Sequence, residues 1–180
     1  MNRRELVKSF IGLGLFGLMP KTIIAKSTQT NYFIGLGGAG CNIVEEQALQ
    51  KAKGNYIFIN NNSRKNIPSN VRLIEIPILT EYTDECAKAE ILLTDEMKNM
   101  FSDKNGNYFL YVGLGAMTGS ELCKKIIPYL VNEKINFRLV YSQPLNFEGR
   151  QRKIKALYAA TFIAELSNCI LFDFNEYRKE

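Results

Sequence analysis

Two glycine-rich loops are the parts of this sequence whose residue types and spacing could do chemistry. The first occupies residues 35–41, reads GLGGAGC, follows an apolar run and opens a segment with helical periodicity. Glycine lets backbone N–H groups approach an anion without a Cβ in the way. A helix N-terminus directly after the loop adds unpaired N–H donors and a favourable dipole. The pattern therefore predicts that phosphate groups bind at this loop.

The second glycine-rich loop occupies residues 113–120 and reads GLGAMTGS. Its expected phosphate ligands are backbone N–H groups together with the hydroxyls of Thr118 and Ser120. The sequence contains no Gly-Lys-Ser or Gly-Lys-Thr, so neither loop is a Walker-type phosphate loop. In an open parallel sheet the first and fourth strands are neighbours where the strand order reverses. We therefore expect both loops to meet in one crevice.

Two other interpretations of the first loop remain open. Gly35, Gly37 and Gly40 also satisfy the G-x-G-x-x-G fingerprint of NAD-binding proteins, which expects an acidic residue about 20 positions later to hold the ribose. The corresponding region, residues 59–63, reads INNNS and has no carboxylate, which weakens that interpretation. The loop could also be a tight turn that packs a helix against a sheet and binds nothing.

The elements that must position these loops are visible as short apolar runs alternating with helix-length segments. The apolar runs predict six strands, at Tyr32–Leu36, Tyr56–Asn60, Val71–Ile76, Tyr108–Val112, Phe137–Tyr141 and Cys169–Phe172. Helices are predicted at Cys41–Lys53, Thr83–Met100, Ser120–Val131 and Arg150–Leu166, with Pro128 as a kink or an early stop. This alternation predicts an α/β, Rossmann-like domain of three layers, in which helices cover both faces of a mostly parallel six-stranded sheet.

The composition excludes several function classes. The chain has 180 residues, 46% of them hydrophobic, which suits a single domain. It has no histidine, the usual general base of Ser and Cys hydrolases, so hydrolytic triads are excluded. Its cysteines form no Cys-x-x-Cys pair and indicate neither a zinc site nor a redox motif, although export would permit disulfides; they are Cys41, Cys86, Cys123 and Cys169.

The charge argues against a nucleic-acid-binding surface. The formal net charge is +5, but the first 25 residues carry four basic residues against one acidic residue, which is +3 of that total. The remaining +2 is spread over 155 residues. Nucleic-acid-binding proteins usually cluster Lys and Arg on one face.

The first 25 residues have the organisation of an export signal. Arg3 and Arg4 open the segment, an uncharged stretch runs from Ser9 to Pro20, and Ala25 offers a small-residue exit. As a helix, the uncharged stretch would cover only about 18 Å of the roughly 30 Å hydrocarbon core, so a spanning helix is not expected. The order Arg-Arg-Glu-Leu-Val-Lys resembles a bacterial twin-arginine (Tat) signal. A short amphipathic or buried N-terminal helix is the alternative.

These segments predict a leader at residues 1–25, a polar linker at residues 26–31 and a nucleotide-binding domain at residues 32–180. Ile23 stands where signal cleavage prefers a small residue, so the leader is either removed or kept as a tether. An uncleaved leader is the only contact with a membrane that the sequence predicts. The expected location is the periplasm or a membrane surface, with the cytoplasm as the alternative.

The loops and three further segments follow one another in the order and spacing of a known family. Residues 35–41 are similar to its GGGGGNAV stretch, residues 58–62 (FINNN) to its F-x-V-N-T-D, and residues 113–120 to its signature GMGGGTGTG. Residues 143–152, QPLNFEGRQR, are close to its K-P-F-x-F-E-G-x-x-R, and residues 171–176 fall where it has an Ile-Pro-Asn-Asp strand end. By these motifs, the sequence from about Tyr32 to Glu176 resembles the GTP-binding half of the FtsZ/tubulin family.

The resemblance implies a site for GTP or GDP, with or without Mg²⁺, and no catalytic residue of its own. The residues that it places around the nucleotide are Gly37, Gly38, Ala39, Gly40 and Cys41 along the phosphates, Gly115, Ala116, Thr118 and Gly119 on their other side, Glu148 and Arg152 near the ribose and a phosphate, and Asn175 near the guanine. A carboxylate accepts from ribose hydroxyls and a guanidinium pairs with an anion, so the residue types fit. The alternative for Glu148 and Arg152 is an exposed pair at the first turn of a helix.

Departures from the family pattern bear on activity. Asn62 replaces an aspartate, Glu121 replaces the last glycine of the signature, and residues 78–82 lack the glycines of the loop near the terminal phosphate. The sequence also shows no counterpart of the family's second domain, whose loop completes a neighbouring subunit's site. The resemblance therefore implies guanine-nucleotide binding with weak or no hydrolysis.

Alternative functions remain open. One is a degenerate, exported interaction or structural protein that binds no nucleotide, and another is an NAD-binding Rossmann protein. A protein partner or a second copy of the chain is a further expectation, and a nucleic-acid partner is not expected.

Overall fold

The structure is a computed structural model that describes residues 29–51, 53–61, 66–77, 79–82, 87–161, 163–164 and 166–172. The predicted leader, Asn62, Cys86 and Asn175 lie outside these residues. Among the described residues, no helix has the length and apolar character needed to cross a bilayer.

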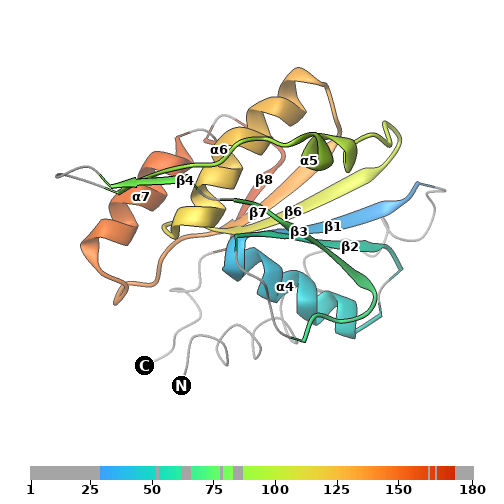
Figure 1. The fold of residues 1–180 in the computed structure, drawn as a ribbon, viewed down its shortest axis with the longest axis horizontal. Coiled ribbons are helices and arrows are strands. Elements are labelled where there is room, and N and C mark those ends of the chain that lie inside the picture. The colour runs from blue at the N-terminus through green and yellow to red at the C-terminus, as the bar shows by residue number, and fades with distance from the viewer. Residues whose placement is uncertain are drawn as a thin grey trace.

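A six-stranded sheet forms the centre of the domain (Figure 1). Its strands run in the order β3-β2-β1-β6-β7-β8, and every neighbouring pair is parallel. They span β1 (Asn31–Leu36), β2 (Asn55–Asn60), β3 (Val71–Glu75), β6 (Asn107–Gly113), β7 (Phe137–Ser142) and β8 (Cys169–Phe172). The predicted α/β class and all six strands are confirmed. The first and fourth predicted strands, β1 and β6, are neighbours, as the expected meeting of the two loops requires.

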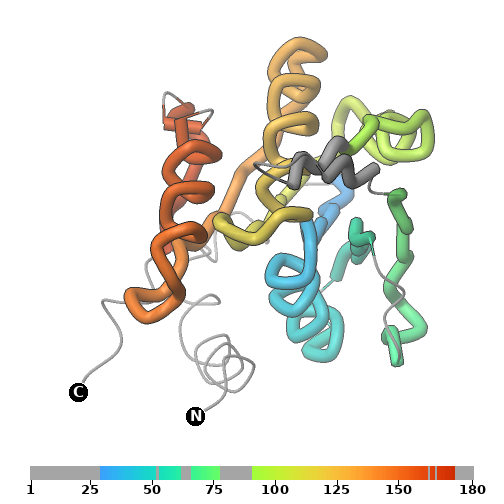
Figure 2. Tube along the Cα trace, turned by 60° about the vertical axis from the view of Figure 1, so that its left-hand side comes forward, coloured from blue at the N-terminus to red at the C-terminus, as the bar shows by residue number. Residues whose placement is uncertain are grey.

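Helices cover both faces of this sheet (Figures 1 and 2). Helix α4 (Gly37–Leu49) packs on one face, and α6 (Met117–Asn132), α7 (Arg150–Ala160) and the short α5 (Asp95–Asn99) lie on the other. Alternate residues of each strand feed the two cores, as the period-two geometry of a strand requires. On the α4 side, Phe33 of β1 stacks on Tyr56 and Phe109 at ring-centroid distances of 5.3 and 5.4 Å.

The predicted helix at Thr83–Met100 is wrong. Residues Leu79–Tyr82 (β4) pair antiparallel with Ala87–Glu90 (β5), so residues 87–90 of that segment are one strand of a two-stranded sheet. Only Asp95–Asn99 is helical, and Thr94 starts this turn by accepting a hydrogen bond from the Met97 N–H at 3.3 Å. Thr94 is a good N-cap residue. The Ala, Lys and Glu residues before it favour a helix by propensity, but strand pairing with β4 overrides that preference.

The other helices differ from the prediction at their ends. Helix α4 begins at Gly37 instead of Cys41, so most of the glycine loop is the helix's first turn. Helix α6 continues through the exposed Pro128 to Asn132, which excludes the early stop. Helix α7 ends at Ala160, where the Thr161 hydroxyl donates to the Tyr158 carbonyl at 2.7 Å.

Candidate functional site

The two glycine-rich loops interlock at the carboxyl ends of β1 and β6. Gly37 has φ +67°, and a Cβ there would lie 2.7 Å from the backbone nitrogen of Gly119. A Cβ on Gly113 would lie 2.6 Å from the Cβ of Ala39. Only glycine at both positions permits this approach, because a side chain at Gly37 would also be strained by the left-handed backbone. The predicted convergence of the loops is confirmed.

The first turn of α4 is pressed against the sheet. A Cβ on Gly40 would lie 2.0 Å from the Tyr111 carbonyl oxygen of β6. The fully buried Cys41 thiol donates to the Gly35 carbonyl at 3.4 Å, so its side chain faces the strand. Of the predicted phosphate ligands, Cys41 can therefore offer only its backbone N–H.

The outer side of the same turn is open. Gly38 is exposed, and a Cβ there would meet no atom within 4 Å. Among the described side chains, none caps the N-termini of α4 and α6, whose N-cap residues are Leu36 and Ala116. Neither first turn contains an acidic residue. Two helix N-termini that lack side-chain caps thus meet at one place, an arrangement that favours an anion.

Two hydroxyls of the second loop have different partners. The Thr118 hydroxyl donates to the Asn61 side-chain oxygen at 2.9 Å, which joins α6 to the end of β2. The buried Ser120 hydroxyl accepts from the Gly115 N–H at 3.0 Å, so it holds its own loop together and does not fit the expected phosphate contact. Asn61 was not among the predicted site residues. Its signal was the run of amide residues directly after the second strand.

The third motif, residues 143–152, touches the second loop. Gly115 has φ +88°, and a Cβ there would lie 2.6 Å from Pro144 Cγ and 2.7 Å from the Arg152 carbonyl oxygen. The motif that follows β7 is therefore brought beside the loop that follows β6. Three segments distant in sequence meet along β1, β6 and β7, at the sheet edge where open α/β domains bind ligands.

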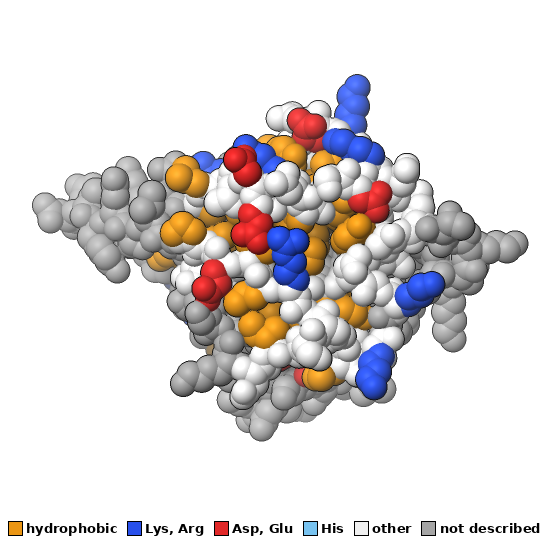
Figure 3. Space-filling view, turned by 45° about the vertical axis from the view of Figure 1, so that its right-hand side comes forward, with side chains coloured by type: hydrophobic (Ala, Val, Ile, Leu, Met, Phe, Trp, Pro, Cys, Tyr) orange, Lys and Arg blue, Asp and Glu red, His pale blue; other side chains and the backbone are white. Residues whose placement is uncertain are grey.

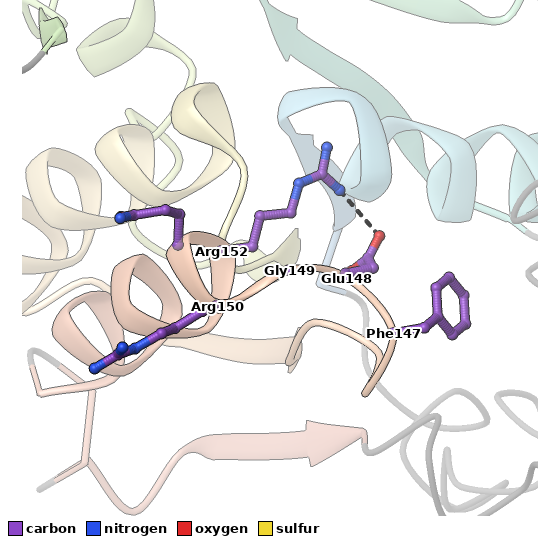
Figure 4. Close-up of a pocket in the computed structure, with 6 residues that line it drawn as sticks. Phe147, Glu148, Gly149, Arg150 and Arg152 are labelled. Atoms are coloured by element: carbon purple, nitrogen blue, oxygen red, sulfur yellow. Dashed lines mark hydrogen bonds and ion pairs between the residues drawn. The ribbon is translucent and has the colours of Figure 1, made fainter.

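Glu148 and Arg152 point toward one another, and Arg150 points away from them (Figure 4). Arg152 Nη1 lies 3.0 Å from Glu148 Oε1, and Glu148 Oε2 accepts from the Leu145 N–H at 3.1 Å. The Glu148 side chain is 8% exposed and that of Arg152 49% exposed. Glu148 thus stabilises the turn before α7 and is largely covered, whereas an exposed pair was the alternative expectation. Residues 147–152 line an open hollow of about 440 Å³ beside this pair.

Glu121, the departure from the family signature, is paired within α6. Lys124 Nζ lies 2.6 Å from Glu121 Oε1 and 4.7 Å from the centre of the Tyr158 ring of α7. The carboxylate therefore has a compensating charge beside it. Its effect on an anion at the N-terminus of α6 is correspondingly reduced.

Cys123 and Cys169 do not supply a reactive thiolate. Burial raises the pKa of Cys123 to about 12, with nearby Cys169 adding to the shift, and burial raises the pKa of Cys169 to about 11. Both thiols are protonated at neutral pH. Within the described part of the chain, Asp, Glu and Cys side chains form no group of three or more that could hold a metal ion.

Comparison with known proteins gives structural matches only. No family model matches the sequence, and no curated protein matches it. Among solved structures, 57 chains match.

Three of these structures are tubulin-like GTPases. CetZ from Methanosaeta thermophila strain DSM 6194 superposes with a TM-score of 0.63 at 15% identity, over 85% of this chain and 48% of CetZ. An empty FtsZ dimer from M. jannaschii gives 0.62 at 15% identity, over 87% and 48% of the two chains. The GDP-bound monomer of CetZ1 from Haloferax volcanii gives 0.60 at 18% identity, over 84% and 53%. The chain thus spans about half the length of each of these structures.

The fold is therefore the FtsZ/tubulin GTPase-like, Rossmann-like α/β fold. At these identities the likeness defines the architecture. The two interlocked loops occupy the edge of the sheet at which this class of fold binds ligands.

Proposed function

We propose that this domain binds a guanine nucleotide, GTP or GDP, with weak or no hydrolysis of its own. The observation that carries the proposal is the contact between Gly37 and Gly119, which brings the N-termini of α4 and α6 together without side-chain caps. The exposed Gly38 leaves room for an anion at this point. Backbone N–H groups of Gly38, Ala39, Thr118 and Gly119 would hold the phosphates, with Mg²⁺ as an optional companion of the bound nucleotide.

The side chains at the site favour guanine nucleotide over NAD. The second strand ends at Asn60 and is followed by Asn61, where an NAD-binding protein would present a carboxylate to the ribose. The structurally similar CetZ1 has GDP bound. Arg152, half exposed beside the second loop, can pair with a phosphate, and Glu148 could then accept from a ribose hydroxyl. By the resemblance alone, Asn175 would contact the guanine.

Weak or absent hydrolysis follows from the groups that surround the loops. Among the described residues, Asn61, Thr118 and Arg152 place an amide, a hydroxyl and a guanidinium beside the loops, and the Glu148 carboxylate is already paired with Arg152. The first three groups bind phosphate oxygens but do not take a proton from water at neutral pH. We therefore expect phosphate release to be far slower than nucleotide exchange.

The proposal is tested by equilibrium binding of fluorescent GDP to the full chain, with unlabelled GTP, GDP and NAD as competitors. GTP and GDP should displace the probe, and NAD should not. Arg152→Ala should weaken binding, whereas Lys155→Ala, three residues further along α7 and also exposed, should not. Displacement by NAD alone would contradict guanine specificity.

A second candidate is an interaction or structural protein that keeps the fold without the ligand. It is favoured by the internal bonds of Thr118 with Asn61, and of Glu148 with Arg152 and the Leu145 N–H. A ligand that uses these side chains must replace such bonds. A folded, monodisperse protein that binds no guanine nucleotide at millimolar concentration would favour this candidate.

We further propose that the leader directs the chain to the periplasm or holds it at a membrane surface. The proposal depends on Arg3 and Arg4 and on the uncharged stretch from Ser9 to Pro20. A reporter fused after Thr30 should be exported or membrane-bound, and Arg3→Lys combined with Arg4→Lys should block Tat-dependent export. Equal export of that double variant would exclude the Tat route.

A further inference from the structure

Helix α7 has an unusual outer surface for a helix that packs on a sheet. Its sequence is RQRKIKALYAA, with four basic residues and no acidic residue. Only Ala156 and Ala159 are buried, and they face the core beside α6. Three large apolar side chains remain exposed: Ile154 at 48%, Leu157 at 64% and Tyr158 at 60%.

These apolar side chains lie on one face. Ile154, Leu157 and Tyr158 stand at positions i, i+3 and i+4, which share one side of a helix. The basic residues Arg150, Lys153 and Lys155 border this stripe and are exposed. We call these six residues the α7 face. Long basic side chains beside an exposed apolar stripe are typical of helices that lie in a membrane interface.

Helix α7 is strongly basic for its length, with four basic residues and no acidic residue among 11. The net charge is +5, of which α7 contributes +4 and the first 25 residues +3, so all other residues together are at −2. On the face of the molecule in Figure 3, acidic and basic side chains are interspersed instead of segregated. The leader, residues 51–72 and α7 are thus the segments with excess positive charge, and among the described helices α7 combines that charge with a stripe of exposed apolar side chains.

This charge excludes two simple occupants of the α7 face. A second copy docked face to face would place the three basic residues of one α7 face against those of the other. The leader is also basic, so its docking on α7 would be repelled. An anionic surface with an apolar interior complements both the basic border and the apolar stripe.

We propose that the α7 face docks on an anionic lipid bilayer. Lys153, Lys155 and Arg150 contact lipid phosphates, and Ile154 and Leu157 enter the boundary between headgroups and acyl chains, with Tyr158 at the same level. Each basic residue near such a surface contributes about 1 kcal/mol, a factor of about five in partitioning. The membrane contact is thus a surface of the folded domain and is additional to any contact made by the leader. Arg152 lies on another side of α7, where it pairs with Glu148, so the membrane contact and the candidate nucleotide site share only their border at Arg150.

The absence of tryptophan from the chain allows a direct test on the full-length protein. Leu157→Trp places a single tryptophan on the α7 face, and Leu49→Trp places one on α4, across the sheet, at a similar exposure of 59%. With vesicles of phosphatidylglycerol and phosphatidylcholine, emission of Leu157→Trp should shift to the blue and be quenched by brominated lipid. Emission of Leu49→Trp should not change, and vesicles of phosphatidylcholine alone should leave both unchanged.

A charge reversal identifies the interaction. Lys153→Glu with Lys155→Glu, added to Leu157→Trp, should abolish the blue shift and lower vesicle partitioning at least tenfold, with unchanged circular dichroism. If Leu157→Trp co-sediments with anionic vesicles and shows no shift, the leader alone binds and the proposal is wrong. A blue shift that grows with protein concentration without vesicles would mean that copies associate through α7, which would also overturn it.

Discussion

Gly38→Val is the substitution that best separates ligand binding from folding in this domain. Gly38 lies in the first turn of α4, its backbone is not left-handed, and a Cβ there meets no atom within 4 Å. Glycine is less favourable than valine in a helix by a few tenths of a kcal/mol. The free energy of unfolding should therefore be unchanged or slightly higher.

The same substitution should abolish nucleotide binding. The valine methyl groups would occupy the open space that a phosphate must enter to reach the N–H groups of Gly38 and Ala39. A hydrogen bond to a charged group contributes about 1.5–3 kcal/mol. Losing two of them amounts to about 3–6 kcal/mol, so the dissociation constant should rise at least about 100-fold.

Gly40→Ala is the matched control with the opposite expectation. Its Cβ would lie 2.0 Å from the Tyr111 carbonyl oxygen, a backbone atom of β6 that cannot move aside easily. Forcing an atom into such a site costs about 1–3 kcal/mol or more. This variant should therefore lose stability first and binding only as a consequence.

Both variants can be measured by urea unfolding and by anisotropy of fluorescent GDP. Gly38→Val should keep the wild-type urea midpoint and lose binding, and Gly40→Ala should show a lower midpoint. Wild-type affinity in a folded Gly38→Val protein would refute the placement of phosphate at this turn. A large loss of stability in Gly38→Val would refute the inference that its outer side is open.

Three further predictions concern stability. Pro128→Ala should raise the free energy of unfolding by about 1–3 kcal/mol, because a proline inside α6 removes a helical hydrogen bond; an unchanged urea midpoint would contradict this. Glu148→Gln should lower the free energy of unfolding by about 1 kcal/mol in the same assay, because the covered carboxylate accepts a hydrogen bond from the Leu145 N–H. No change would show that this carboxylate does not stabilise the turn before α7. Burial raises the pKa of Cys123 from 9.0 to about 12 in the folded protein, so the contribution of its protonated thiol to the free energy of unfolding should be fully present below pH 9 and fall as the pH rises toward 12. Urea midpoints at pH 8, 9 and 10 should decline less steeply for Cys123→Ala, and an equal decline would exclude this thiol as a cause.

The strands and the convergence of the loops could be predicted because they depend on local patterns and one topological rule. Strands such as Tyr108–Val112 are apolar without interruption because helices bury both faces of the sheet. The glycines of the two loops are needed where backbones touch, as between Gly37 and Gly119. Strand order then brings the loops together at β1 and β6.

The errors arose where contacts distant in sequence decide the outcome. Ala87–Glu90 has good helix-forming residues but pairs with Leu79–Tyr82, and no local pattern shows that pairing. The hydroxyls of Thr118 and Ser120 look equivalent in the sequence, yet one donates to Asn61 and the other accepts within its own loop. Side-chain partners of this kind depend on the exact approach of neighbouring elements, which residue types alone do not define.

The central claim, that the two glycine-rich loops form one nucleotide-phosphate site, is tested most directly by nuclear magnetic resonance. Backbone amide resonances of the isotope-labelled protein would be followed while GDP is added. The amides of Gly38 and Ala39 in the first loop and of Thr118 and Gly119 in the second should shift together and give one dissociation constant. Shifts confined to one loop, or no shift in either at millimolar GDP, would contradict the claim.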